Sequence, residues 1–300
     1  MKKKYLLSVN VGFAVNRFTD LRKFSSFVKD FLKIEYIQLT SDFLMLNMND
    51  KYVYRHAEKL AKELNKKNIK INSTFTGAFS RLNHLSHPNK DHQYYWLKWF
   101  KRFFQISRNL GANYSGSHLG IVGLDEKNKL SKILKKRLIN NWLTLSEYAY
   151  KIGLKGIIWE PMSVTREFGE TISKTKNIQK LLNTRTKNRF FLCLDVAHGD
   201  ETSKNPADYN PYAWLKEFSL DSPVIHLKQK IKNQYNHLPF LSKNNCIGII
   251  NNKKVINILN HGGPDTQELS LELNFKERNA TEKKLKKEVL ESVNYWKEVI

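Results

Sequence analysis

Four short apolar runs in the second half of the chain each end in a side chain that can bind a metal: Gly156-Ile-Ile-Trp-Glu160, Phe190-Phe-Leu-Cys-Leu-Asp195, Pro223-Val-Ile-His226 and Leu269-Ser-Leu-Glu272. Each run has the length and the β-branched or aromatic content of a buried strand. The four polar groups should therefore emerge at the carboxyl ends of parallel strands, where barrel enzymes carry their chemistry. One strand ending in a charged residue is commonplace, but four in succession point to a site.

The whole chain repeats one unit, a short apolar run followed by enough residues for a helix. Eight strand candidates can be counted: Tyr5–Val11, Glu35–Leu39, Lys70–Phe75, Asn113–His118, Lys155–Glu160, Arg189–Asp195, Pro223–Leu227 and Glu268–Leu273. Their starts recur at the interval expected for the strand-helix units of a barrel. Segments with apolar residues three or four apart lie between them, and two of these end at Gly111 and Gly153, as helices often do. We therefore predict an α/β fold, a (β/α)8 TIM barrel in which residues 1–300 form a single domain.

The charge balance is the main competing clue. Lys and Arg number 51 against 28 Asp and Glu, a formal net charge of +23. Such an excess is typical of proteins that bind nucleic acid or membrane surfaces. The lysines are scattered along predicted helices, however, and no recognisable nucleic-acid module accompanies them. We interpret the charge as solvated helix faces and expect no specific nucleic-acid partner.

Several classes of protein are disfavoured by the remaining sequence. No apolar stretch approaches the roughly 20 residues needed to cross a bilayer, and the basic start is interpreted as the first strand, so no membrane partner is expected. Cys193 and Cys246 form neither a disulfide framework nor a CxxC metal spacing, which favours a reducing, cytoplasmic location. Gly262-Gly263-Pro264 precedes a strand rather than a helix, so it predicts a turn and no nucleotide site.

The strand-end residues resemble a known family. Trp159-Glu160-Pro161, Leu194-Asp195-Val-Ala-His198, Ile225-His226 and Leu271-Glu272 are similar to the metal-binding pattern of the xylose-isomerase-like barrels, in particular their sugar-phosphate isomerases and 3-epimerases. The resemblance implies that Glu160, Asp195, His226 and Glu272 hold one divalent ion, Mn, Mg, Co or Zn, and that Glu160 and Glu272 also move the proton. The implied partner is a small sugar or sugar phosphate, with a short ketose phosphate as one example.

The chemistry explains why such a set is needed. Removing a proton next to a ketone produces an enediolate, whose negative charge a metal chelated by two substrate oxygens stabilises. Two flanking carboxylates can return the proton to the opposite face of the same carbon, which is epimerisation, or to its neighbour, which is isomerisation. The sequence leaves both outcomes open, as well as the metal, the sugar and the oligomeric state, for which a homodimer is one expectation.

Five further polar residues are candidate substrate contacts. His198 resembles the family's contact to a substrate hydroxyl or carbonyl, with a locally bonded loop histidine as the alternative. His118 ends the fourth predicted strand, where a substrate contact and a packing role are both open. Lys228 and Gln229 follow His226 and are predicted to lie at the barrel mouth. Arg166 could clamp a phosphate or a distal hydroxyl, or it could form a surface pair with the glutamate that follows it.

Two segments bear on whether the substrate is phosphorylated. The stretch from Phe75 to Pro88 is similar to the corresponding part of bacterial barrels linked to tetrulose-phosphate metabolism, and Arg81 or His84 could reach a phosphate or be ordinary loop residues. Free-sugar 3-epimerases have an arginine shortly beyond the histidine ligand, where this chain has three lysines, Lys228, Lys230 and Lys232. That departure disfavours a free sugar.

An apurinic-site endonuclease of the same barrel superfamily is the alternative from another class. Such enzymes share strand-end Glu, Asp and His residues and would be helped by a positive surface. They use a cluster of several zinc ions, and the Asp-rich segment that normally follows one ligand histidine is replaced here by Leu227-Lys-Gln-Lys230. Metal content separates the two, because one ion per chain favours the isomerase or epimerase and about three favour the nuclease.

Overall fold

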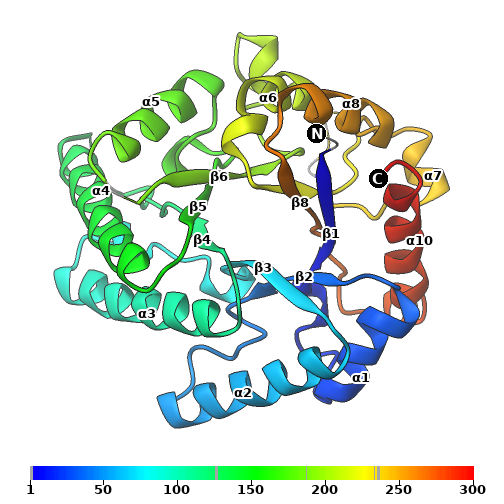
Figure 1. Ribbon diagram of the computed structural model, residues 1–300. Coiled ribbons are helices and arrows are strands. Elements are labelled where there is room, and N and C mark those ends of the chain that lie inside the picture. Colours follow the sequence, from blue (N-terminus) through cyan, green and yellow to red (C-terminus); the bar gives the residue numbers. More distant parts are fainter. Residues whose placement is uncertain (1–2, 126–127, 187, 233, 235–236) are drawn as a thin grey trace.

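The computed structural model describes residues 3–125, 128–186, 188–232, 234 and 237–300. Its strands form one closed barrel in chain order, with every neighbouring pair parallel and β8 closing on β1 (Figure 1). The strands are β1 (Lys4–Asn10), β2 (Tyr36–Thr40), β3 (Lys70–Phe75), β4 (Tyr114–His118), β5 (Gly156–Glu160), β6 (Phe190–Asp195), β7 (Val224–Leu227) and β8 (Thr266–Leu271). The predicted (β/α)8 barrel is confirmed.

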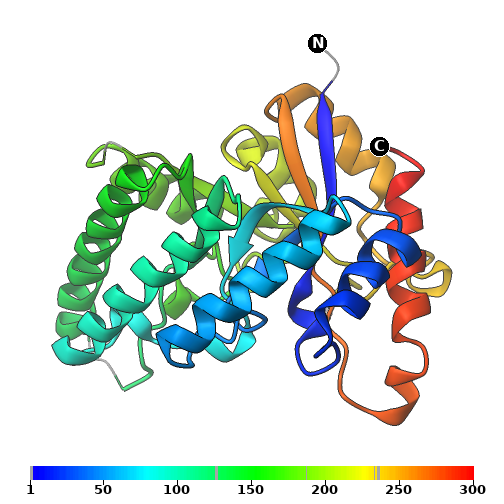
Figure 2. The same ribbon diagram turned by 60° about the horizontal axis from the view of Figure 1, so that its bottom comes forward.

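Helices surround the barrel on its outside, and Figure 2 shows them inclined alongside the strands. The α-helices are α1 (Leu21–Ser26), α2 (Asp50–Lys66), α3 (Lys90–Asn109), α4 (Asn128–Lys151), α5 (Ile172–Asn183), α6 (Pro211–Phe218), α7 (Ser242–Asn245), α8 (Asn252–Gly262), α9 (Asn279–Glu282) and α10 (Leu285–Lys297). Their apolar stripes pack against the outer face of the sheet, with Phe100 and Trp142 among the fully buried side chains. Gly111 and Gly153 both have positive φ angles after α3 and α4, as helix-ending glycines do.

The first and last strands have the predicted lengths, but β1 ends one residue and β8 two residues earlier than the sequence predicts. β1 stops at Asn10 because the Asn10 side chain accepts a hydrogen bond from the Gly12 amide, 2.9 Å away, and caps a 3-10 turn at Val11–Ala14. β8 stops at Leu271, although the Glu272 amide still donates to the Leu227 carbonyl at 3.0 Å. Glu272 therefore remains anchored to β7.

The barrel interior contains both a small apolar cluster and a buried carboxylate. Phe75, Ile158, Cys193 and Val224 form a small apolar cluster of their own. The buried Glu268 of β8, whose register partner on β7 is Val224 of this cluster, accepts hydrogen bonds from Ser8 at 2.7 Å and from Asn72 of β3 at 2.9 Å. Since β3 and β8 are not neighbours in the sheet, the second bond crosses the barrel. Burial raises the pKa of Glu268 above its ordinary value.

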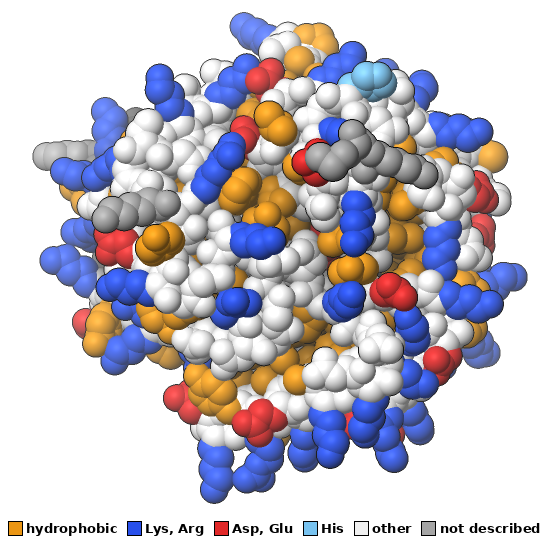
Figure 3. All heavy atoms as spheres, in the orientation of Figure 1, with side chains coloured by type: hydrophobic (Ala, Val, Ile, Leu, Met, Phe, Trp, Pro, Cys, Tyr) orange, Lys and Arg blue, Asp and Glu red, His pale blue; other side chains and the backbone are white. Residues whose placement is uncertain are grey.

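The surface carries the positive charge in a dispersed form. Figure 3 shows Lys and Arg side chains around the whole outline of one face, with Asp and Glu side chains among them. Several lysines are paired, for example Lys29 with Glu35 at 2.9 Å and Lys67 with Asp30 at 2.7 Å. Among the described residues, no helix combines the length and the apolar character that a membrane span requires.

Candidate metal centre and catalytic cavity

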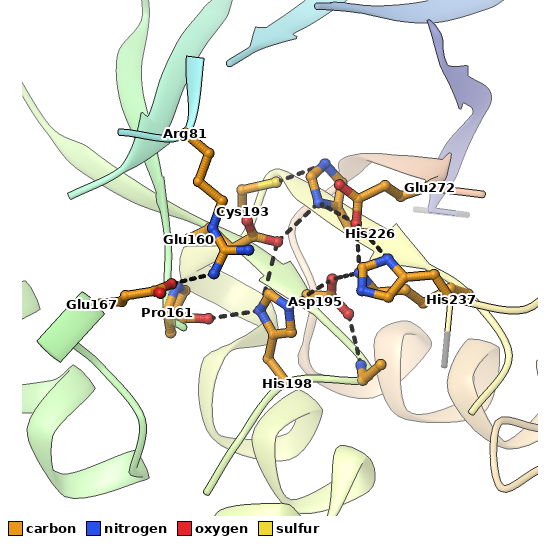
Figure 4. Close-up of polar contacts among 12 residues, drawn as sticks. Arg81, Glu160, Pro161, Glu167, Cys193, Asp195, His198, His226, His237 and Glu272 are labelled. Carbon is orange, nitrogen blue, oxygen red and sulfur yellow. Dashed lines mark hydrogen bonds and ion pairs between the residues drawn. The ribbon is translucent and has the colours of Figure 1, made fainter. Parts of the chain in front are cut away.

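Four strands bring the predicted ligands together. Glu160 ends β5, Asp195 ends β6, His226 lies in β7 and Glu272 directly follows β8. One ligand atom from each of the four lies within 4.8 Å of the others. The sheet register contributes directly, because Asp195 and His226 are paired residues of β6 and β7. Glu160 and Glu272, the first and last of the four in the sequence, are 112 positions apart, and the fold brings all four together (Figure 4).

Buried cations lie among the three carboxylates. Lys228 is fully buried, and its ammonium donates to Glu272 Oε2 at 2.6 Å and forms an ion pair with Asp195 Oδ2. Burial alone would raise the pKa of Glu272, but Lys228 and His226 lower it to about 2. Burial would likewise raise the pKa of Asp195, and the neighbouring His198 and Lys228 hold it below the ordinary range. Asp195 and Glu272 are therefore ionised at neutral pH.

The imidazole of His226 points one nitrogen at the carboxylates and the other at the barrel interior. Nδ1 lies 3.1 Å from Glu160 Oε1 and 3.6 Å from Glu272 Oε2. Nε2 lies 2.7 Å from Gln38 Oε1 and 3.2 Å from Cys193 Sγ. Burial opposes charging of the ring, but the adjacent carboxylates raise the pKa of His226 well above its ordinary value. Burial raises the pKa of Cys193 to about 12, so it is a neutral thiol.

The donor set fits a divalent ion by its chemistry. Three carboxylates and one imidazole provide hard oxygen ligands and one nitrogen, a combination that suits Mn, Mg, Co or Zn. The convergence of three carboxylates also favours a dication, and the nitrogens nearest to these carboxylates belong to Lys228 and His226, with His198 farther away at 3.5 Å from Asp195. Glu160, Asp195, His226 and Glu272 are the residues that would hold it.

A cavity of about 520 Å³ opens above this group. Glu160 and Glu272 both line it, as do His118, His198, Lys228 and Arg81. Aromatic side chains form part of its wall, including Phe13 and Phe75. Its volume suits a small polar molecule, and its mixture of charged and aromatic walls suits one that has both hydroxyls and a carbon skeleton.

Two histidines on the cavity wall are held by backbone carbonyls. His198 Nδ1 donates to the Pro161 carbonyl at 3.0 Å, which turns its Nε2 toward Asp195 Oδ2 at 3.5 Å. His118 Nε2 donates to the Leu82 carbonyl at 3.3 Å. Burial lowers the pKa of His118 to about 4, so this ring is neutral. Both histidines lie where the sequence predicts them.

The structure separates the remaining predicted contacts. Gln229 is fully buried in the loop after β7. Its Nε2 donates hydrogen bonds to the Asn245 side chain at 2.9 Å and to the Ile250 carbonyl at 3.0 Å. Arg166 turns toward the Val122 carbonyl and does not line the cavity. Arg81 does line it, and its guanidinium is paired with the buried Glu167. Of the two arginines, Arg81 is the one that faces the cavity.

Two residues at the site were not predicted from the sequence. Gln38 of β2 reaches His226 across the interior, and its only signal was a polar residue in the middle of a buried strand. His237 accepts a hydrogen bond from Lys228, 2.9 Å from its Nδ1. It comes from a long loop whose path no periodicity encodes. His84, the other phosphate candidate, is fully buried against His118, with ring centroids 4.5 Å apart, and does not line the cavity.

Known proteins resemble the chain in sequence and in fold. Residues 32–298 match the family described as xylose isomerase-like TIM barrel. A D-erythrulose 1-phosphate 3-epimerase of Brucella abortus (strain 2308) is 33% identical over 294 residues, which is 97% of this chain and 94% of that protein. A Rhodospirillum rubrum ATCC 11170 protein, provisionally assigned as a xylose isomerase, superposes with a TM-score of 0.84 at 22% identity over 100% of both chains. D-psicose 3-epimerase of Clostridium cellulolyticum H10, solved with D-tagatose, gives 0.68 at 13% identity over 100% of this chain and 99% of that one.

Proposed function

Because the chain belongs to the family of xylose isomerase-like TIM barrels and is an enzyme of the isomerase class, we propose a specific reaction for it. It is a metal-dependent 3-epimerase of a short ketose phosphate. The Brucella abortus relative makes D-erythrulose 1-phosphate the first substrate to test. The single observation that carries the proposal is a pair of ionisable carboxylates, Glu160 and Glu272, on the wall of one cavity.

The two glutamates can act as a pair of bases. Glu160 comes from β5 and Glu272 from the end of β8, with β6 and β7 between them. A ketose bound between them presents one face of its C3 carbon to each carboxylate. One carboxylate takes the C3 proton and the other returns a proton to the opposite face, so the configuration inverts with no net change in protons. When bound, the divalent ion supplies positive charge that stabilises the negative charge developing on the substrate oxygens.

Arg81 is proposed as the contact to the substrate phosphate. Its side chain is about half exposed, at 48%, whereas its partner carboxylate on Glu167 is buried, at 4%. The buried carboxylate therefore fixes one edge of the guanidinium, and the remaining N–H groups are free to bind an anion. A planar guanidinium suits bidentate recognition of phosphate oxygens.

The experiment is an epimerase assay with D-erythrulose 1-phosphate and, in parallel, unphosphorylated erythrulose. We expect the purified protein loaded with Mn, Co, Mg or Zn to interconvert the two C3 epimers of the phosphate ester, and to prefer it over the free sugar. Asp195→Asn should remove most of the bound metal and the activity while leaving the fold intact, because metal affinity depends on ligand charge. Protein that is metal-free by elemental analysis, and unaffected by added ions, would count decisively against the metal site.

Arg81 and Arg166 offer a matched pair of variants. Both contact Glu167, but only Arg81 lines the cavity. Arg81→Met should reduce kcat/KM for the phosphate ester by about 100-fold, the order expected when a charged hydrogen-bonded contact is lost, and should affect the free sugar little. Arg166→Met should leave both values within about threefold of the wild type. Equal losses in the two variants would remove Arg81 from the proposed phosphate site.

A further inference from the structure

A chain of hydrogen bonds behind the ligand group determines how His226 is presented. It begins at the backbone amide of Gly12, which can only donate, and this amide donates to Asn10 Oδ1 at 2.9 Å. The Asn10 side-chain oxygen is thereby identified, so its Nδ2 is the atom that donates to Gln38 Oε1 at 2.6 Å. Gln38 Oε1 is then an acceptor, and its own Nε2 donates to Ser73 Oγ at 3.1 Å.

The last link of this chain reaches the imidazole. Gln38 Oε1 lies 2.7 Å from His226 Nε2, and two acceptors cannot face each other at that distance, so Nε2 must carry a hydrogen. Exchanging the oxygen and nitrogen of the Gln38 amide, so that Nε2 of Gln38 faced the ring, would not give a consistent set of hydrogen bonds. The NH2 group of Gln38 would then face that of Asn10, and reversing Asn10 as well would set an NH2 against the Gly12 amide. The Cys193 thiol, 3.2 Å from the same nitrogen, then serves as a weak acceptor.

We propose that Gln38, oriented by Asn10 and Gly12, is a positioning residue that keeps the proton of His226 on Nε2 and so reserves Nδ1 for the divalent ion. Nδ1 is the nitrogen that faces Glu160 Oε1 and Glu272 Oε2, at 3.1 and 3.6 Å. Gln38 and His226 are both fully buried, so water cannot take over the role of the glutamine. The role of Gln38 in metal binding rests on the proposed metal site. The inference that Nε2 carries a hydrogen rests on the hydrogen bonds alone.

Outer partners of metal-bound histidines typically contribute 10- to 100-fold in metal affinity. Gln38→Met should therefore weaken Zn²⁺ binding by about that factor, because it removes the acceptor at similar volume. Gln38→Glu should bind Zn²⁺ at least as well as the wild type, because a carboxylate still accepts from both Asn10 and Nε2–H. Gln267→Met is the matched control, since Gln267 is an equally buried glutamine whose amide bonds to the Ser219 and Ser222 carbonyls instead. It should lose stability without losing metal affinity.

The direct test is ¹⁵N NMR of the histidine rings in the full-length protein, with His226→Asn as the assignment variant, recorded with and without Zn²⁺. We expect a protonated Nε2 in both states and a zinc-shifted Nδ1 in the loaded protein, together with the affinity order given above from isothermal calorimetry. An unprotonated Nε2, or Zn²⁺ affinity in Gln38→Met equal to that of the wild type, would overturn the assignment. If the wild type binds no Zn²⁺, the metal site fails, and the Nε2 resonance still decides the inference about the proton.

Discussion

At the scale of single residues, the site is defined by where its positive charges lie. Lys228 touches Asp195 and Glu272, while His226 faces Glu160 and Glu272. The ammonium of Lys228 thus lies between two predicted ligands, Asp195 and Glu272, and contacts an oxygen of each. A divalent ion bound by the same carboxylates would neutralise part of the negative charge that Lys228 now neutralises.

Replacing Lys228 by methionine tests this sharing. Without an ion, the variant leaves two buried carboxylates without their main partner, which should cost about 3 to 5 kcal/mol of the free energy of unfolding. Added Mn²⁺ or Zn²⁺ should raise its melting temperature more than that of the wild type, because the ion no longer competes with an ammonium. Lys230→Met is the control, since Lys230 also lines the cavity but pairs with Glu201. Identical ion-induced shifts in all three proteins would show that Lys228 does not share the ligands.

His118 predicts a dependence of stability on pH. Its pKa is lowered to about 4 in the folded protein, mainly by burial, against 6.5 in the unfolded chain. Between these values the unfolded state binds more protons, so stability falls as the pH drops from 6.5 toward 4, by roughly 3 kcal/mol from this residue. His84, whose pKa is also lowered by burial, adds a slope of the same sign. Urea unfolding at pH 7 and pH 4.5 should show a smaller difference in His118→Gln than in the wild type, and an unchanged difference would refute this assignment.

At the scale of elements, a strand decides which of its side chains reach the cavity. The alternation of β7 continues past its end at Leu227, so His226 and Lys228 both contact the ligand carboxylates, whereas Gln229 bonds to Asn245 and Ile250. The prediction of Gln229 at the cavity placed it by proximity in sequence and ignored this alternation. The positions of Glu160, Asp195 and Glu272 could be predicted because each follows an apolar run. The charged residue that stops such a run shows where the buried strand ends.

The loops explain what could not be predicted at this scale. Arg81 and Arg166 lie in two different connections, and both contact Glu167, yet only Arg81 reaches the cavity. Their directions depend on loop backbone, such as the positive φ of 71° at Phe168, that no hydrophobic period encodes. Gln38 was missed for a different reason, because its partner His226 comes from a distant strand across the barrel interior.

The pairing of β4 with β5 depends on Gly116. A Cβ atom at this position would lie 1.6 Å from the Ile158 carbonyl oxygen of β5. This oxygen belongs to the backbone of the neighbouring strand, which cannot move away without breaking the sheet. We expect Gly116→Ala to lower the free energy of unfolding by roughly 3 kcal/mol or more. At Gly111, by contrast, a Cβ meets nothing within 4 Å and only the positive φ of 91° is strained, so Gly111→Ala should cost about 1 kcal/mol. Chemical denaturation of the two variants checks this order, and equal losses would contradict it.

At the scale of the whole molecule, the positive charge is a distributed surface property. The net charge of +23 is spread over the faces of the helices rather than gathered around the cavity, whose described lining also includes Glu160, Glu272, Asp42 and Glu277. Among the described residues, a single group of three or more His, Cys, Asp and Glu side chains is close enough to hold a metal. One ion per chain is therefore expected, rather than the zinc cluster of the nuclease alternative.

Binding to DNA should accordingly be weak and independent of sequence. We expect the affinity for a duplex to fall steeply between about 50 and 200 mM salt, because it depends on the release of counterions from phosphates. A fluorescence anisotropy titration at several salt concentrations measures this. Incision of a duplex at an abasic site at physiological salt, with about three zinc ions per chain, would favour the nuclease instead.

The central claim is that Glu160 and Glu272 move the C3 proton of the substrate, and the most direct measurement of it is solvent exchange. The metal-loaded protein is incubated with the proposed ketose phosphate in heavy water, and deuterium in substrate and product is followed by NMR. We predict that epimerised product carries deuterium at C3, and that Glu272→Gln lowers this exchange far more than it weakens substrate binding. Epimerisation that proceeds without deuterium from the solvent would contradict the claim and remove the two glutamates from proton transfer.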